Sequence, residues 1–231
     1  MNILQLLFPL RCPVCDDIVR PYGAKICVPC REKLKLLTPP WCMQCGKKLY
    51  TDGYLCQDCQ RKKHKYLRGR ALYEYESAAP AIYRFKYGKR QEYADFFGEE
   101  IARFLGNFIR QCNPDGLIPV SLHAKRMRHR GYNQAQLIAE ALSEHTGIPV
   151  NGVLIGRCKR TKPLKNLTGR ERQNNLKKAF KILQNDVKLD TIVIIDDVYT
   201  TGSTADAMTQ VLQSAGISKV YVLTLTIGRG I

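Results

Sequence analysis

Two adjacent acids near the end of the chain, Asp196 and Asp197, separate a run of apolar residues from a cluster of small hydroxyl side chains. The apolar run, residues 192–195, has the composition of a buried strand, and the stretch ADAMTQVLQSAG after the cluster has that of a helix. The cluster is Thr200, Thr201, Gly202, Ser203 and Thr204. A glycine lets the backbone approach an anion, and the first turn of a helix adds unpaired N–H groups. The pattern predicts a phosphate-binding loop, although it lacks the G-x-x-x-x-G-K spacing of a P-loop.

Carboxylates beside a phosphate-binding loop suggest a particular ligand. The loop would bind a phosphate, while Asp196 and Asp197 accept hydrogen bonds from two neighbouring hydroxyl groups. A ribose 5-phosphate carries both features, so we expect one at this position. The alternative is an ordinary helix cap preceded by acids that coordinate magnesium or face water.

Eight of the ten cysteines form four regularly spaced C-x-x-C pairs. The pairs are Cys12/Cys15, Cys27/Cys30, Cys42/Cys45 and Cys56/Cys59. Two such turns together direct four thiolates at one point, which suits tetrahedral zinc. We therefore expect two structural zinc ions in two stacked ribbons, the first four cysteines on one ion and the last four on the other. A crossed pairing satisfies the same geometry. Disulfides are the rival interpretation, which we disfavour because the sequence shows no secretory signal peptide.

The chain is strongly basic, with 37 Lys+Arg against 20 Asp+Glu and a formal net charge of +17. Such a charge favours phosphate-rich partners, nucleic acid or a nucleotide metabolite, over acidic proteins or bare lipid. A merely soluble basic surface is the alternative. Uninterrupted apolar stretches stay shorter than the roughly 18 residues of a membrane helix. We expect a cytoplasmic protein without membrane insertion.

The rest of the chain alternates between strand and helix patterns. Strands are expected at residues 70–76, 115–122, 150–157, 191–196 and 219–227. Helices are expected within 81–112, interrupted at Gly88, and over 133–146, closed by Gly147. The α/β order predicts a mainly parallel sheet with helices on both faces, and ligands of such sheets bind at the carboxyl ends of the strands. We expect a double zinc-ribbon domain in residues 1–66 and the α/β domain in residues 67–231.

The predicted phosphate loop resembles a known signature. Type I phosphoribosyltransferases bind phosphoribosyl pyrophosphate (PRPP) with a hydrophobic strand, two acids, two mostly apolar residues and T-T/S-G-x-T. Asp196, Asp197 and residues 200–204 match this signature position by position. With the cysteine pairs in front, the chain is most similar to the ComF family, which is associated with natural transformation and the uptake of single-stranded DNA.

A second stretch, IPVSLHAKRMRHRGYNQAQLIAE, resembles the family block P-V-P-L-H…R…R-G-F/Y-N-Q. Ser121 stands where proline is usual. After the expected strand, a turn would present Lys125, Arg126 and Arg130, which are suited to neutralising a departing pyrophosphate. A basic helix face with no active role is the alternative.

A third stretch, RCKRTKPLKNLTGRERQNNLKKAF, resembles the long mobile loop of the family, with Leu164 in place of the usual glutamine. Its basic residues are Arg157, Lys159, Arg160, Lys162, Lys165, Arg170 and Arg172. Such a charge density is expected of a lid over a polyphosphate, or of a strip along a nucleic-acid backbone. A solvated polar loop is the alternative.

The resemblance implies a phosphoribosyltransferase-like domain that binds PRPP with magnesium. Asp196 and Asp197 would contact the ribose, the loop would bind the 5′-phosphate, and Arg126 and Arg130 would face the pyrophosphate. These two acids and two arginines are the expected catalytic residues, and Ser121 and Lys125 are further expected PRPP contacts. Phosphoribosyl transfer is implied, but no residue identifies the acceptor. Thr200 stands where relatives specific for 6-oxopurines have an aspartate, which argues against that base. The alternatives are a DNA-binding factor without turnover and a PRPP-responsive regulator. The expected partners are PRPP, single-stranded DNA and proteins of the competence machinery.

Overall fold

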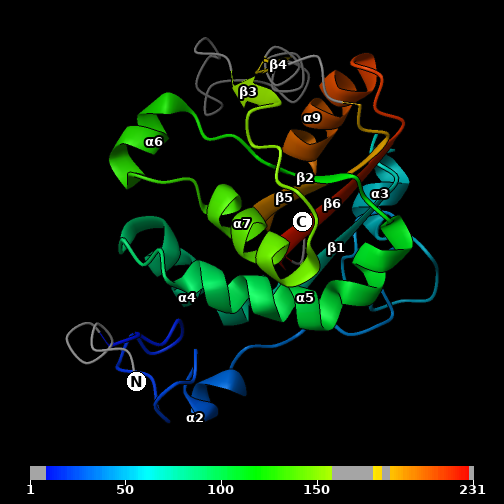
Figure 1. The fold of residues 1–231 in the computed structure, drawn as a ribbon. Helices are drawn as coiled ribbons and strands as arrows, with labels where there is room; N and C mark the ends of the chain where they lie inside the picture. Colours follow the sequence, from blue (N-terminus) through cyan, green and yellow to red (C-terminus); the bar gives the residue numbers. More distant parts are fainter. Residues whose placement is uncertain (1–8, 158–178, 184–187, 229–231) are drawn as a thin grey trace.

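A four-stranded parallel sheet forms the centre of the molecule (Figure 1). The computed structural model describes residues 9–157, 179–183 and 188–228. Across the sheet the strands follow the order β1 (Arg68–Glu74), β6 (Lys219–Ile227), β5 (Thr191–Tyr199) and β2 (Gly116–Pro119). All three pairings are parallel, and Val150 adds a single parallel bridge to Leu117 at the edge. The prediction of a mainly parallel sheet is therefore confirmed.

Helices cover both faces of this sheet, as the sequence predicts. Val193 and Ile195 point into the core shared with α4 (Tyr75–Tyr87), α5 (Tyr93–Cys112) and α7 (Gln134–Thr146). Ile192 and Ile194 point into a second core shared with α9 (Ser203–Ser214). Side chains alternate across a strand, so a strand with both sides covered is apolar throughout. The completely buried run 192–195 is the result.

Two short elements stand near the carboxyl end of the sheet. After β2 the chain forms α6 (Ala124–Arg130), a helix with no buried residue. Further on, β3 (Ile155–Arg157) and β4 (Phe180–Ile182) pair antiparallel, and β4 packs beside α9. Figure 1 shows α6 and the β3/β4 pair on the same side of the sheet. The expected breaks also appear, since Gly88 caps α4 and Gly147 ends α7 with a φ of 72°.

The two cysteine modules lie apart, which differs from the stacked ribbons that the sequence suggested. The first module, with α2 (Val28–Arg31), packs against the α4 and α5 side of the molecule. The second, with α3 (Gln57–Arg61), packs against the α9 side. Figure 1 shows α2 beneath α4 and α5, and α3 near α9. Each module therefore completes a different core, which the cysteine spacing alone does not specify.

The link between the modules runs along the open edge of the sheet. Leu36 forms an antiparallel bridge with Tyr73 of β1, and Leu37 N–H donates to Leu72 O at 2.9 Å. Glu74 N–H donates in return to Lys35 O at 2.9 Å. Unpaired backbone groups of an edge strand are thereby satisfied. The same path carries the chain from one side of the sheet to the other, which explains the separation of the modules.

The strand that carries the acids is longer than expected. The sequence predicts that β5 ends as the acids begin, yet it continues through both of them to Tyr199. The neighbouring strand explains the difference, because Asp196 pairs with Thr224 and Val198 with Thr226 of β6. Within the described residues, no helix is both long and apolar enough to cross a membrane.

Candidate functional site

The predicted phosphate loop joins β5 to α9 at the carboxyl end of the sheet. Gly202 has a φ of 68° and is the N-terminal cap of α9, with no side chain capping the helix there. The first-turn N–H groups of α9 therefore face the loop, as anion binding requires. Thr200 and Thr201 are exposed, whereas Gly202 is buried. Thr201 Oγ1 and Ser203 Oγ share a hydrogen bond of 2.9 Å.

One pocket brings most of the predicted loop residues together with an acid. Its polar lining comes from β5, the loop, the start of α9 and the neighbouring strand β6: Asp196, Tyr199, Thr200, Gly202, Ser203, Thr204 and Thr224. Val120, the residue after β2, closes another side. A carboxylate, hydroxyls and helix N–H groups thus converge on one small space. The strand, the acids, the loop and α9 follow one another in the order that the sequence predicts.

The two acids differ in their surroundings. Burial, together with the adjacent charge of Asp197, raises the pKa of Asp196 to about 7. The Asp197 N–H donates to Asp196 Oδ1 at 2.8 Å and opposes that rise. Asp197 itself forms an ion pair, because its Oδ2 lies 3.1 Å from Lys86 Nζ. At neutral pH the site therefore contains one paired carboxylate and one that is close to its midpoint of ionisation.

Lys86 is a site residue that sequence reasoning missed. It lies in the last turn of α4, more than 100 positions before the acids in the sequence, and its side chain is mostly buried against them. Other lysines nearby, such as Lys89, have the same local composition around them. No sequence signal distinguishes Lys86, because only the packing of α4 against the sheet brings it to Asp197.

The turn after β2 contributes a mixture of anchored and free side chains. Ser121 Oγ donates to Ile155 O at 2.7 Å and so joins this turn to β3. Lys125 and Arg126 lie on α6 and are exposed. Arg130 donates to Gln134 Oε1 at 2.8 Å, and its guanidinium lies 5.0 Å from the centre of the Tyr87 ring. The structure therefore directs Arg130 towards α4 and α7, while the pyrophosphate role expected of it stays a prediction.

Arg157 is the described member of the basic stretch that follows β3. Its guanidinium lies over Phe180 at 5.5 Å, and its Nε is buried without a hydrogen-bond partner among the described residues. Burial lowers the pKa of Arg157, with a further lowering from Arg126 and an opposing effect from Asp196. This cation therefore lies within electrostatic reach of both the acids and α6. The other predicted lid residues, Lys159, Arg160, Lys162, Lys165, Arg170 and Arg172, lie outside the described residues.

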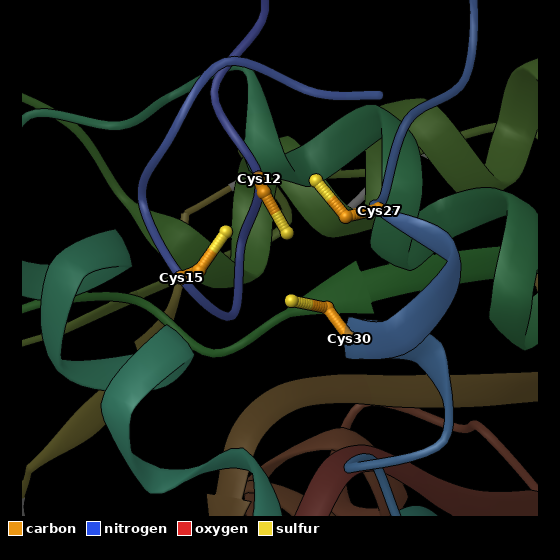
Figure 2. A group of neighbouring side chains, drawn as sticks. All are labelled: Cys12, Cys15, Cys27 and Cys30. Carbon is orange, nitrogen blue, oxygen red and sulfur yellow. The ribbon is translucent and has the colours of Figure 1, made fainter. Parts of the chain in front are cut away.

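Both cysteine groups have the geometry of a metal site. Each contains four sulfur atoms within 4.8 Å of one another, Cys12, Cys15, Cys27 and Cys30 in the first and Cys42, Cys45, Cys56 and Cys59 in the second. Figure 2 shows the four side chains of the first group directed at a common centre. This confirms the sequential grouping over the crossed one. Cys45 Sγ and Cys56 Sγ are 3.7 Å apart, close to the roughly 3.8 Å edge of a zinc tetrathiolate with 2.3 Å bonds.

Each group combines one thiol whose pKa is lowered with neighbouring thiols whose pKa is raised. Although burial acts in the opposite direction, backbone N–H donors from Cys15 and Cys27 lower the pKa of Cys12. In the second group, hydrogen bonds from the thiols of Cys45 and Cys59 lower the pKa of Cys42. Thiolate is the form that binds zinc. Four sulfur ligands leave no coordination position for a substrate, so these groups suit structural zinc.

Comparison with known proteins matches the cysteine-rich part of the chain to a family model and most of the chain to curated relatives. Residues 3–60 match the family model described as the double zinc ribbon domain. Competence protein F of Haemophilus influenzae is 29% identical over 225 residues, which span 93% of this chain and 96% of the relative. The DNA utilization protein YhgH of Escherichia coli K12 is 30% identical, spanning 80% and 82%. Competence protein ComFC of Bacillus subtilis is 29% identical, spanning 78% and 74%.

Solved structures give a weaker likeness. The hypoxanthine phosphoribosyltransferase of Trypanosoma cruzi aligns with 59% of this chain and 68% of its own, at 14% identity and a TM-score of 0.34. A TM-score this low supports no inference about function.

Proposed function

The chain belongs to the ComF family of competence and DNA utilization proteins, and we propose that it handles single-stranded DNA during natural transformation and binds PRPP in its α/β domain. We further propose that it transfers the phosphoribosyl group to an acceptor with release of pyrophosphate. The observation that carries the proposal is the pocket in which Asp196 meets the hydroxyls and helix N–H groups of the phosphate loop. Its neighbours are an ion-paired Asp197 and the partly buried cation Arg157.

Each part of PRPP has a partner in this arrangement. The 5′-phosphate would accept hydrogen bonds from the first turn of α9 and from the loop hydroxyls. Asp196 and Asp197 would accept hydrogen bonds from the ribose hydroxyls. The pyrophosphate would lie towards Lys125, Arg126 and Arg157. Magnesium, when bound with PRPP, supplies further positive charge to the pyrophosphate.

The proposed reaction breaks the bond between ribose C1 and the pyrophosphate oxygen. The electron pair of that bond leaves with pyrophosphate, and the cationic groups near the site stabilise the charge that develops there. A lone pair of the acceptor forms the new bond to C1, and the acceptor's proton passes to solvent. Thr200, where 6-oxopurine enzymes resembling this chain have aspartate, gives no carboxylate to contact such a base.

A surface beside the site supports the DNA part of the proposal. We call it the α4–α6 surface, and it consists of Tyr83 and Tyr87 of α4 with Arg128, His129 and Arg130 of α6. The two tyrosines are 66% and 50% exposed, and their ring centres lie 5.1 Å apart. Helix α6 contains five basic residues, no acid and no buried side chain. Exposed rings among positive charges suit unpaired bases and their phosphates.

Ligand-dependent unfolding tests the PRPP part of the proposal. PRPP with magnesium should raise the unfolding temperature, because a ligand that binds only the folded state stabilises it. The double substitution Asp196→Asn and Asp197→Asn should abolish that rise, since it removes both charged acceptors with little change in volume. Wild-type affinity in the double variant would show that the acids do not contact PRPP.

A pyrophosphate-release assay distinguishes the enzyme from its alternatives. PRPP-dependent release in the presence of one candidate base, and not without it, would identify an acceptor. PRPP binding without release for any acceptor, together with DNA binding that does not depend on PRPP, would instead favour a non-catalytic DNA-binding factor. DNA affinity that changes with PRPP would favour a PRPP-responsive regulator.

A further inference from the structure

The segment after the second cysteine group reaches the back of the phosphate loop. His64, five residues beyond Cys59, is 7% exposed. Its Nδ1 lies 3.0 Å from Oδ2 of Asp206, a residue in the first turn of α9. Lys62 Nζ reaches the same oxygen at 2.6 Å, and Lys65 N–H donates to Asp206 Oδ1 at 2.9 Å. Three residues of this segment therefore converge on one carboxylate.

Asp206 connects that segment to the loop. Its own N–H donates to Gly202 O at 2.8 Å, so the residue contacts the loop through its backbone and the segment through its side chain. Burial works against a charged carboxylate, yet hydrogen bonds from His64 and Lys62 lower the pKa of Asp206. His64 and Lys62 thus compensate the negative charge of Asp206 in the first turn of α9. The N–H groups of that turn stay available to a ligand at the loop.

The second nitrogen of His64 continues the network into β5. Nε2 lies 3.3 Å from the hydroxyl of Tyr199, the last residue of the strand. Tyr199 shares a 2.6 Å hydrogen bond with the hydroxyl of Tyr66, and the rings of His64 and Tyr66 stack with centres 5.0 Å apart. One imidazole therefore contacts both ends of the loop, Tyr199 before it and Asp206 after it.

Gly202 lies directly against this network. A Cβ placed on Gly202 would lie 2.7 Å from Cε1 of His64 and would also overlap the hydroxyl of Tyr199. The backbone of the loop therefore rests on the imidazole. Gly202 also has a positive φ, which glycine adopts without strain. A side chain at this position would therefore strain the backbone and would collide with His64 and Tyr199.

The first cysteine module makes no comparable contact within the described part of the chain. Its side chains pair with α4 and α5, as in Lys25 with Asp95 at 2.8 Å and Arg31 with Glu100 at 2.6 Å. Tyr93 of α5 donates to Asp16 Oδ1 at 2.7 Å. These contacts stabilise the opposite side of the molecule and do not involve residues 199–206.

We propose that His64 is a positioning residue for the phosphate loop, so that phosphate-ligand binding depends on the second cysteine group being folded around its metal but not on the first. This rests on the proposed function only for the identity of the ligand, PRPP. The residues of the second module act on the ligand through the backbone of Gly202 and the first turn of α9.

Substitution of His64 tests the positioning role. In His64→Ala, PRPP with magnesium should bind at least about tenfold more weakly, the effect of losing one or two buried hydrogen bonds. The amide hydrogens of residues 200–206 should exchange faster without ligand, while zinc content stays at the wild-type value. His64→Gln, which retains a donor for Asp206, should recover part of the affinity. If His64→Ala does not fold, Tyr199→Phe removes only the hydroxyl and gives the same readouts.

The matched control is Tyr93→Phe, which removes a buried hydroxyl that contacts the first module. It should lower the unfolding temperature without changing PRPP affinity or exchange in the loop. If His64→Ala likewise lowered the unfolding temperature without changing PRPP affinity or loop exchange, the role of His64 would be purely structural and the proposal would be overturned. Wild-type protein that fails to bind PRPP would refute the proposed ligand, and loop exchange in the two variants would still decide whether His64 positions the loop.

A second comparison tests the dependence on one metal group. Cys15→Ser and Cys56→Ser each replace a partly exposed cysteine of a different group. Each should lose one zinc ion, measured by elemental analysis. Only Cys56→Ser should also show faster exchange at residues 200–206 and weaker PRPP binding. Equal loss in both variants, or retention in Cys56→Ser after its zinc is gone, would contradict the proposal.

Discussion

Replacing Asp196 by asparagine should stabilise the protein in the absence of ligand. Burial and the charge of Asp197 raise the pKa of Asp196 from an ordinary 3.8 to about 7. The folded protein therefore binds a proton more tightly than the unfolded chain, and ionisation of Asp196 costs folding free energy. This cost appears as pH rises above about 4, grows up to about pH 7 and is constant above it. Asparagine has the same shape and does not ionise, so its variant avoids the cost.

The magnitude follows from the two pKa values. Their difference corresponds to an upper limit of about 4 kcal/mol, at about 1.4 kcal/mol for each unit. The side chain is partly exposed, and screening by solvent reduces this figure. We expect Asp196→Asn to be more stable than wild type by roughly 1 to 3 kcal/mol at pH 8. The advantage should narrow by up to about 1.4 kcal/mol for each pH unit below 7.

Denaturant unfolding of the zinc-loaded protein between pH 6 and pH 8.5 measures this difference. Asp115→Asn is the control at the other end of the same pair of strands, where backbone N–H groups of Thr191 and Asp190 lower the pKa of Asp115. That variant should lose stability instead of gaining it. An Asp196→Asn protein that is no more stable than wild type at pH 8, or whose advantage grows as pH falls, would refute the account of Asp196.

Three further outcomes are expected. Elemental analysis should find two zinc ions per chain, because each cysteine group is a complete tetrathiolate, and one ion would contradict two independent sites. Gly202→Ala should lower the unfolding free energy by about 1–2 kcal/mol or more and abolish PRPP binding. Gly147→Ala is the control, because it introduces the same backbone strain but its added Cβ has no neighbour within 4 Å, and it should retain binding. In gel-shift titrations, single-stranded DNA should bind with a salt slope of about −0.7 per phosphate contact. Changing Lys159, Arg160, Lys162 and Lys165 to glutamate should weaken that binding, as should Tyr87→Ala, and no binding of wild type at about 50 mM salt would refute the DNA proposal.

Local patterns predicted the parts of the fold that depend on neighbouring residues in the sequence. Apolar runs and helix-spaced positions located most of the strands and helices, and Gly88 and Gly147 marked two helix ends. Two predictions were wrong in part, since residues 75–76 begin α4 and the predicted strand 150–157 is a strand only at Ile155–Arg157. The acids and the loop were found because strand, carboxylates, glycine and helix follow one another without interruption. Cysteine spacing likewise predicted both metal groups. The boundary between domains at residue 66 stays a prediction.

Contacts between residues far apart in the sequence determine the features of the site that these local patterns did not predict. Lys86 and His64 are ordinary residues in their local sequence, one in a helix and one in a basic segment. Both become part of the site because the sheet brings α4 and the second module to the carboxyl end of β5. The length of β5 was also underestimated, since pairing of Asp196 with Thr224 of β6 cannot be read from β5 alone.

The site combines groups that support the phosphate loop with groups that line its pocket, and Tyr199 belongs to both. Asp206 and Tyr199 have their side chains paired on the side of the second module, by Lys62, His64 and Tyr66. The loop hydroxyls and Asp196 line the pocket together with Tyr199. Because these contacts already hold the backbone of the loop in place, the loop can bind an anion with little reorganisation. The second cysteine module therefore does more than add a stable domain to the chain, since the residues that follow its last cysteine contact Tyr199, Gly202 and Asp206 and so support the phosphate loop.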